Sequence, residues 1–224
     1  MKKTTCFIVF LAFFSTSIYA QSPKKLTSNQ IYEKIQKLNF LGSVLYIAAH
    51  PDDENTRLIS YMANTVKART AYLSLTRGDG GQNLIGTEVR EKLGLIRTQE
   101  LLAARRTDGA EQFFSRANDF GYSKSKEETL TIWDKEQVLS DMVWTIRNFQ
   151  PDVMVTRFSP TYLKTHGHHL TSAVLAKEAF EAAADPNRFP EQLKYVKVWQ
   201  VKRLVWNSWM PQYIEGYDSS DLDS

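Results

Sequence analysis

All four histidines of this 224-residue chain fall in two short motifs. The first motif, AHPDDE, occupies residues 49–54, and the second, HGHH, occupies residues 166–169. Imidazole is the commonest metal ligand among side chains and titrates near neutral pH. Histidine gathered in two places therefore predicts one metal-assisted active site, assembled from two distant segments of the chain.

The first motif places an imidazole and a carboxylate three residues apart, at His50 and Asp53. If a helix begins here, side chains at this spacing share a face and can bind one ion. Asp52 then points elsewhere and is free to act on water held by the metal, while Pro51 fixes the turn and Glu54 braces it. The alternative is a simple helix cap, in which Asp52 and Asp53 bind backbone N–H groups and His50 packs incidentally.

Near-continuous apolar runs precede both motifs, which is typical of strands buried on both faces of a parallel sheet. We expect strands at 43–49, 70–76, 112–114, 152–158 and 196–206, and helices at 28–38 (capped by Ser28), 53–65, 88–106, 135–148 and 170–184. Residues 77–86, which hold four glycines, and residues 115–128 are expected to be loops. Strands that alternate with helices predict an open α/β sheet, in which sites form beyond the carboxyl ends of the strands.

The first twenty residues differ in character from the rest. Lys2 and Lys3 precede a short apolar run at 7–14 and small residues up to Ala20, which is the layout of a secretory signal peptide. We expect a signal peptide at 1–20, a leader and helix at 21–41, one domain at 42–212 and a polar tail at 213–224. The mature protein would be exported to the periplasm or the extracellular space; an uncleaved N-terminal anchor is the alternative.

Charge and composition exclude several classes of partner. Without Lys2 and Lys3 the chain has 26 basic and 25 acidic side chains, and no basic run is interleaved with aromatic residues. Nucleic acid is therefore not an expected partner. No later apolar stretch reaches the roughly 20 residues that cross a bilayer. The single cysteine, Cys6, lies in the expected signal peptide, so neither disulfides nor thiolate metal sites are expected in the mature protein.

The sequence resembles the PIG-L/LmbE-like family of zinc-dependent N-acetylglucosaminyl de-N-acetylases. Residues 49–54 match its AHPDDE signature letter for letter, and residues 166–169 match its H-x-x-H element, often written HPDH. The resemblance covers about residues 42 to 208 and implies a Rossmann-like three-layer α/β fold with a mainly parallel sheet. It also implies hydrolysis of an N-acetyl or other N-acyl group on an amino sugar or glycoconjugate, with Zn²⁺ or Fe²⁺ as the cofactor.

The resemblance assigns roles to the motif residues. His50, Asp53 and His169 would hold the metal, which leaves open positions for water and substrate. Asp52 would be the general base acting on zinc-bound water. His166 would stabilise the oxyanion and protonate the leaving amine.

The second motif departs from the family pattern at His168, where an aspartate usually stands. That aspartate would influence the orientation or pKa of His166, so its loss puts the protonation state of His166 in doubt. His168 is also a candidate substitute ligand. The alternative for the whole motif is that its histidines only cap the helix that follows.

Weaker matches lie between and around the motifs. By the resemblance, Arg97 and Asp119 would contact the substrate, although an ion pair with Glu100 is an equally good interpretation of Arg97. Lys164 stands where some relatives have a substrate-binding tyrosine. Residues 76–81 match a glycine-rich loop of the family, or are an ordinary turn. The tryptophans Trp199, Trp206 and Trp209 more often indicate sheet packing than a carbohydrate groove.

Two other functions remain open. The same metal ligands could serve another metallohydrolase, such as a phosphoesterase, but only Arg77, Arg97 and Lys164 offer cations for a phosphate. A non-catalytic exported carbohydrate-binding module is the second alternative, and the intact Asp52 argues against it. The oligomeric state does not follow from the sequence.

Overall fold

The structure is a computed structural model that describes residues 25–161 and 165–208. The expected signal peptide and polar tail lie outside the described residues, as do Lys164 and Trp209. The chain divides into two compact units, residues 1–36 and 37–224. Within the described residues, no helix is both long enough and apolar enough to span a membrane.

The first unit contains helix α2, Ser28–Lys37, as the sequence predicted. The Thr27 hydroxyl accepts a hydrogen bond from the Gln30 N–H and caps this helix, so the expected cap at Ser28 was wrong by one residue. None of its residues is buried; Ile31 and Ile35 are both exposed.

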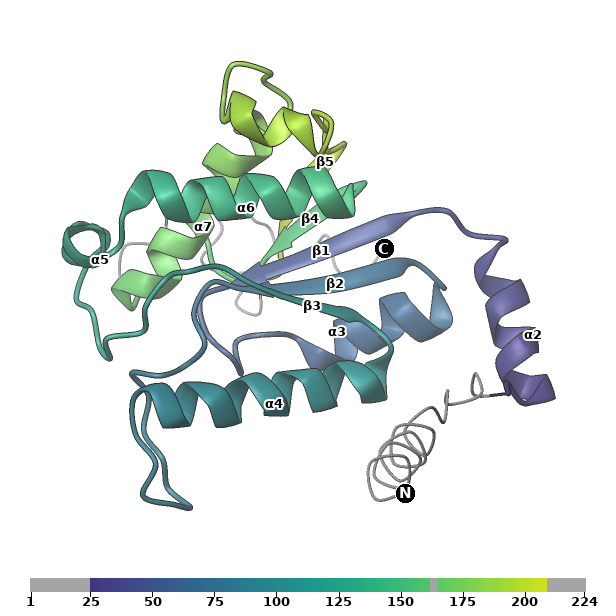
Figure 1. Ribbon diagram of the computed structural model, residues 1–224, viewed down its shortest axis with the longest axis horizontal. Helices are drawn as coiled ribbons and strands as arrows, with labels where there is room; N and C mark the ends of the chain where they lie inside the picture. Colours follow the sequence, from purple (N-terminus) through teal and green to yellow (C-terminus); the bar gives the residue numbers. More distant parts are fainter. Residues whose placement is uncertain (1–24, 162–164, 209–224) are drawn as a thin grey trace, which may run out of the picture. The chain divides into compact units, whose positions relative to one another are not determined.

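Five parallel strands form the sheet of the second unit, in the order β3-β2-β1-β4-β5. The strands are β1 Ser43–Ala48, β2 Arg69–Ser74, β3 Glu111–Phe114, β4 Val153–Thr156 and β5 Arg203–Trp206. The chain runs outward from β1 to β2 and β3, and then returns to β4 on the other side of β1 (Figure 1). In such a sheet, the reversal between β1 and β4 opens a crevice at the carboxyl ends of these two strands.

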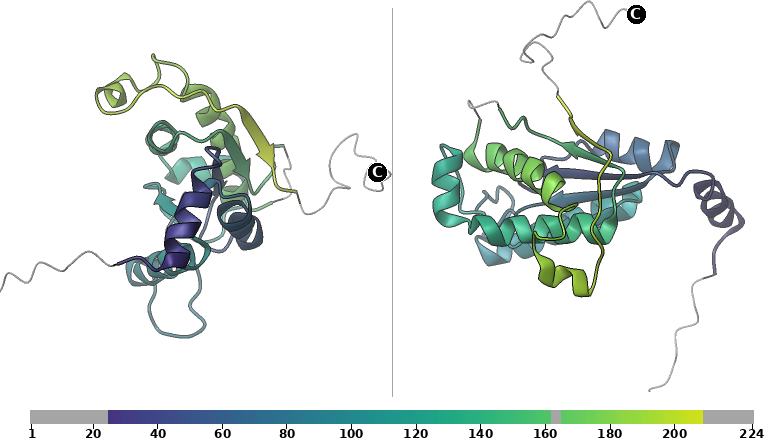
Figure 2. Two further views of the ribbon diagram at one scale, coloured as in Figure 1. Left: turned by 90° about the vertical axis from the view of Figure 1, so that its right-hand side faces the viewer. Right: turned by 90° about the horizontal axis from the view of Figure 1, so that it is seen from above.

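Helices cover both faces of the sheet, which gives the expected three-layer Rossmann-like fold (Figures 1 and 2). One face carries α3 Thr56–Ser60, the π-helical turn η1 Tyr61–Thr65 and α4 Glu91–Asp108; the other carries α5 Lys126–Ile132, α6 Lys135–Phe149 and α7 Gly167–Ala182. Alternate residues of β1 enter the two cores: Leu45 packs with residues of α6 and α7, and Tyr46 with residues of α3 and α4. All six β1 residues are therefore buried, which is why its sequence is almost continuously apolar.

Three expectations about the elements were wrong. Helix α5 lies partly in the expected loop 115–128, and its cap is Ser125, whose hydroxyl accepts a hydrogen bond from the Glu128 N–H. Helix α7 begins at Gly167, so the second motif forms its first turn. The expected strand 196–206 is reduced to Arg203–Trp206. The backbone before Arg203 forms hydrogen bonds outside the sheet: the Trp199 N–H donates to the carbonyl of Ala183, just beyond the end of α7.

Candidate functional site

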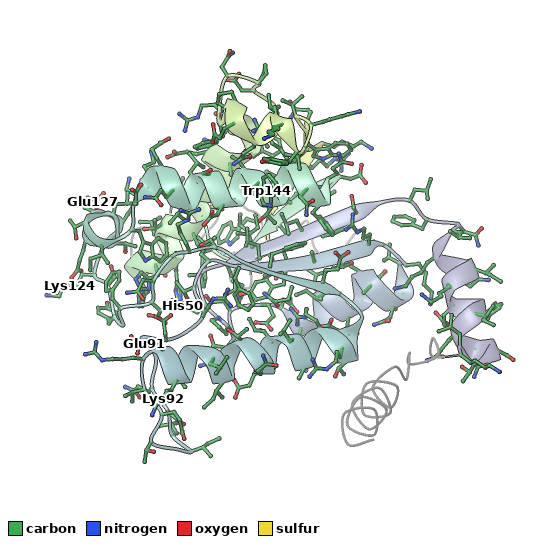
Figure 3. The ribbon with its side chains drawn as sticks, viewed as in Figure 1. His50, Glu91, Lys92, Lys124, Glu127 and Trp144 are labelled. Atoms are coloured by element: carbon green, nitrogen blue, oxygen red, sulfur yellow. The ribbon has the colours of Figure 1, made fainter. Side chains whose placement is uncertain are left out.

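Both histidine motifs lie at the carboxyl ends of β1 and β4, on either side of the crevice. The first motif follows β1 directly, and the second opens α7, which is the helix after β4. Figure 3 shows His50 at this end of the strands. Residues more than a hundred positions apart are brought together here because the two strands are parallel neighbours in the sheet.

The first motif forms a tight turn rather than the start of a helix. The Asp53 N–H donates to the His50 carbonyl (3.3 Å), and Asp53 Oδ2 accepts from the His50 N–H (2.7 Å). Helix α3 begins only at Thr56, and its cap is the side chain of Asn55. The helix-cap interpretation of Asp52 and Asp53 was therefore wrong, and so was the expectation that a shared helix face brings His50 and Asp53 together.

One potential ligand atom from each of His50, Asp53 and His169 lies within 4.8 Å of the other two. His50 Nδ1 is 3.2 Å from Asp53 Oδ2, and His169 Nε2 is 3.4 Å from Asp53 Oδ1. Zinc bonds of about 2.0–2.2 Å in a tetrahedral site place ligand atoms roughly 3.4 Å apart. The spacing fits one ion, and the ligand role of the three residues stays a prediction.

The pKa shifts of this group differ between its members: those of Asp53 and His169 favour metal binding, whereas that of His50 favours its protonated form. Burial pulls the pKa of His50 down, but the hydrogen bond and charge of Asp53 raise it overall. Burial tends to raise the pKa of Asp53, but the hydrogen bond from His50 and the charge of His169 lower it overall. Burial lowers the pKa of His169 to about 4. An ionised Asp53 and a neutral His169 are the forms that bind metals.

Asp52 lies on the open side of the turn, with its side chain 70% exposed. Its φ of 104° is unusual for a residue other than glycine, and aspartate tolerates positive φ better than most. Its N–H donates to Glu54 Oε2 (3.0 Å), and its carboxylate pairs with Arg97 Nη2 (3.0 Å). Arg97 also donates to the Pro51 carbonyl (2.6 Å). Backbone and carboxylate of Asp52 are thus both held.

Glu54 is itself held by Arg105 of α4, which sequence reasoning missed. Glu54 Oε1 lies 3.3 Å from Arg105 Nη2, and the two side chains are only 4% and 3% exposed. The same nitrogen of Arg105 lies 2.7 Å from Asp108 Oδ2. The one available signal was position: Arg105 stands four residues after Leu101, on the buried face of α4.

Tyr72 of β2 fixes the other end of the turn. Its hydroxyl donates to the His50 carbonyl (2.5 Å), and its ring faces the Arg105 guanidinium at 5.6 Å. Because Tyr72 is fully buried on β2, its hydroxyl ties the turn that contains His50 and Asp53 to the sheet.

His168 is fully buried and contacts the ring of His50. Its Nδ1 lies 2.9 Å from His50 Nε2 and 4.0 Å from Asp119 Oδ1. The aspartate usual at this position was expected to influence His166, whereas the ring of His168 forms its hydrogen bond with His50. Ligand atoms of His50, His166 and His168 form a second group within 4.8 Å, so the substitute-ligand interpretation stays open.

His166 caps α7, as one alternative predicted: its Nδ1 accepts from the His168 backbone N–H (3.1 Å). An acceptor at Nδ1 places the proton of the neutral ring on Nε2. Burial, followed by the charge of His50, lowers the pKa of His166, so the ring is neutral near pH 7. The ring centroid lies 5.4 Å from that of His50 and 4.9 Å from that of Tyr122.

Arg97 forms the ion pair with Glu100 that the sequence allowed, and it also contacts Asp52, which the sequence analysis did not predict. It pairs with Glu100 through Nε (3.1 Å) while its Nη2 reaches Asp52. Asp119 is buried, and its Oδ1 accepts from the Gly121 N–H (2.9 Å) while facing His168. The substrate-binding roles of Arg97 and Asp119 stay predictions.

Two of the three tryptophans named in the sequence analysis, Trp199 and Trp206, lie within the described residues. Trp199 Nε1 donates to the Pro151 carbonyl (2.7 Å), and Trp206 Nε1 donates to the Arg157 carbonyl (3.3 Å). Trp199 also packs against the hydrophobic core, in agreement with the sheet-packing interpretation.

The glycine-rich loop lies against the site. A Cβ on Gly80 would overlap the Asp119 carbonyl and the Gly121 nitrogen, so only glycine fits this close approach. Beside it lies an open cavity of about 390 Å³, whose polar lining includes Asp79, Arg90 and Asn118 together with Asp119.

Comparison with known proteins gives a consistent family assignment. The model of the PIG-L family, described as GlcNAc-PI de-N-acetylase, matches residues 45–180. Mycothiol S-conjugate amidase of Streptomyces coelicolor is 25% identical over 177 residues, which are 73% of this chain and 60% of that protein. The chain thus spans less than two thirds of that relative.

Solved structures show the same fold. N,N'-diacetylchitobiose deacetylase from Pyrococcus horikoshii has a TM-score of 0.61 at 19% identity, covering 90% of this chain and 77% of that one. GalB, the 4-carboxy-2-hydroxymuconate hydratase from Pseudomonas putida, has a TM-score of 0.55 at 20% identity, covering 73% and 64%. Because one of these is a deacetylase and the other a hydratase, likeness of fold does not select the reaction.

Proposed function

The chain belongs to the PIG-L (GlcNAc-PI de-N-acetylase) family, and on that premise we propose that it is a metal-dependent hydrolase that removes an N-acyl group, most simply acetyl, from an amino sugar or a sugar conjugate. The observation that carries the proposal is the convergence of His50, Asp53 and His169 beside the held carboxylate of Asp52. Export of the protein, which depends on residues 1–20, is part of the same proposal.

The donor set fits Zn²⁺, and Fe²⁺ is the alternative. Two imidazoles and one carboxylate are the ligands of a catalytic site that keeps positions open, and their spacing suits bonds of about 2.0–2.2 Å. When bound, such an ion would acidify a water molecule and polarise the acyl carbonyl.

Asp52 is the general base of the proposed reaction. Its carboxylate is open to solvent, stands next to Asp53 in the chain, and is oriented by Arg97. It takes the proton from the attacking water and returns it to the departing amine. Positioned proton transfer of this kind contributes typically about 10²–10⁴-fold to rate.

His166 donates to the oxyanion from Nε2, because its Nδ1 is occupied by the His168 N–H. A neutral imidazole suffices for this hydrogen bond, so the donor role does not require the imidazolium form. One such donor is worth about 3–4 kcal/mol of transition-state stabilisation. With a neutral His166, the proton for the leaving amine comes from Asp52.

The substrate class is supported by the relatives, two of which are named as an amidase and a chitobiose deacetylase. The cavity lined by Asp79, Asn118 and Asp119 offers the hydrogen-bonding groups that a sugar needs.

The test is bound-metal measurement on the purified full chain together with a screen of N-acetylglucosamine, N,N'-diacetylchitobiose and sugar conjugates for free amine. We expect about one metal ion per chain and metal-dependent amine release. Asp52→Asn should keep the metal and lose at least 10²-fold in kcat, whereas His169→Ala should lose the metal. Release of phosphate from phosphoesters without release of amine would refute the proposal.

A further inference from the structure

His168 has a fixed place in the core of the second unit. Its ring stacks on Trp133 (centroids 4.8 Å apart, planes at 14°), and the ring of Phe120 meets it edge-on at 4.4 Å. Its side chain is 0% exposed. In this packed position, Nδ1 of the imidazole lies 2.9 Å from His50 Nε2.

The other ring nitrogen of His168 has no partner. Nε2 is buried and makes no hydrogen bond within the described residues. A buried polar atom without a hydrogen-bond partner lowers the stability of the folded protein. Stability alone therefore does not explain a histidine at this position. The hydrogen bond between His168 Nδ1 and His50 Nε2 is the contact that points to another role.

The two imidazoles share one proton across their 2.9 Å contact, and this links the contact to metal binding. If His50 Nδ1 binds a metal, its proton is on Nε2 and donates to His168 Nδ1. If His50 Nδ1 instead keeps its proton and donates to Asp53 Oδ2 (3.2 Å), then His168 Nδ1 is the donor to His50 Nε2. A neutral imidazole serves both states, whereas a carboxylate can only accept.

We propose that His168 is a positioning residue. Its Nδ1 accepts a hydrogen bond from the His50 Nε2–H, which holds the His50 ring in place and leaves His50 Nδ1 free for the metal. The proposal rests on the proposed function, because it assigns a partner to one of the metal ligands. Loss of a group that orients a metal ligand typically costs about 10–100-fold in metal affinity.

The experiment compares three variants by zinc dissociation constant, measured in competition with a chelator, and by the visible spectrum of the cobalt-loaded full chain. His168→Leu keeps apolar volume and removes the hydrogen bond, so zinc affinity should fall about 10–100-fold and the cobalt spectrum should change. His168→Asn offers an amide that can donate or accept, so it should recover most of that loss. Phe120→Leu is the packing control, and it should bind zinc within about threefold of the original chain.

Three results would overturn the proposal: His168→Leu binding zinc as the original chain does, no recovery by His168→Asn, or an equal loss in Phe120→Leu. Two ions per chain, falling to one in His168→Leu, would instead make His168 a ligand of a second metal with His50 and His166. Failure of the proposed function is distinguishable, because it would appear as tight single-ion binding without amine release.

Discussion

At Gly167 the first turn of α7 packs closely against Ser123 and Ser125, and this close approach allows a quantitative test. The Gly167 N–H donates to the Ser123 carbonyl (2.8 Å), and its carbonyl accepts from the Thr171 hydroxyl (2.7 Å). A Cβ at Gly167 would overlap Ser125 O and Ser123 Oγ and lie 2.7 Å from the Ser125 carbonyl carbon. Two of these three atoms belong to the backbone of the residue that caps α5.

Gly167→Ala should therefore be strongly destabilising. Overpacking costs about 1–3 kcal/mol, and we expect the upper part of this range, about 2–3 kcal/mol, because backbone atoms cannot rotate away. For a chain of this size, that loss corresponds to a fall in Tm of roughly 4–12 °C. The methyl group also pushes on the first turn of α7, which carries His166, His168 and His169, so zinc affinity should fall as well.

The assay is thermal and urea unfolding in excess chelator, followed by zinc titration of the folded variant. The matched control is Gly86→Ala, whose Cβ would meet the far ends of two side chains, the Glu88 carboxylate and the Asn83 amide, so its stability should change by less than about 0.5 kcal/mol. Equal stability of the two variants would refute the packing argument. If Gly167→Ala lost the expected stability but bound zinc with unchanged affinity, the link between Gly167 and the site would be refuted.

Three further predictions concern the groups around the metal ligands. Glu54→Ala leaves Arg105 buried with only Asp108 as its acidic partner and should cost about 3 kcal/mol in urea unfolding; a change under about 1 kcal/mol would contradict it. Arg97→Met frees the Asp52 carboxylate and should lower kcat about 10-fold or more at unchanged zinc content, so an unaltered kcat would remove Arg97 from the mechanism. In the metal-free protein, the free energy of unfolding should fall as pH drops from about 6.5 to 4, because unfolded histidines bind protons in this window. In the folded protein, burial holds the pKa of His169 at about 4 and that of His168 at about 3, so these residues bind protons less readily than in the unfolded chain. The raised pKa of His50 opposes this loss of stability. Urea midpoints that rise on acidification would contradict the prediction.

Much of the architecture could be predicted because burial leaves a local pattern. The apolar runs at 43–49, 70–76 and 152–158 correspond to β1, β2 and β4, whose inner residues pack on both faces. Short or irregular segments were missed where local pattern and tertiary pairing disagree. Residues 196–202 look like a strand, but the Trp199 N–H bonds to Ala183, so strand pairing starts only at Arg203.

The candidate site likewise has features that the sequence predicted and features that it missed. Residue types and spacing singled out His50, Asp52 and Asp53 after a buried strand, whereas the resemblance to the family assigned His169 as the third ligand. The turn that joins His50 to Asp53 was mistaken for a helix start, since the same residues are favourable in both.

The sequence by itself determined which chemical groups stand after which strands, because strand burial and helix capping depend on neighbours within a few residues. Only the tertiary structure decided that His50 and His169 meet at one point, that Arg105 anchors Glu54, and that the ring of His168 bonds to His50. Such contacts join residues about fifty or more positions apart, and they depend on which strands lie side by side and on which side chains the packed layers exclude from water.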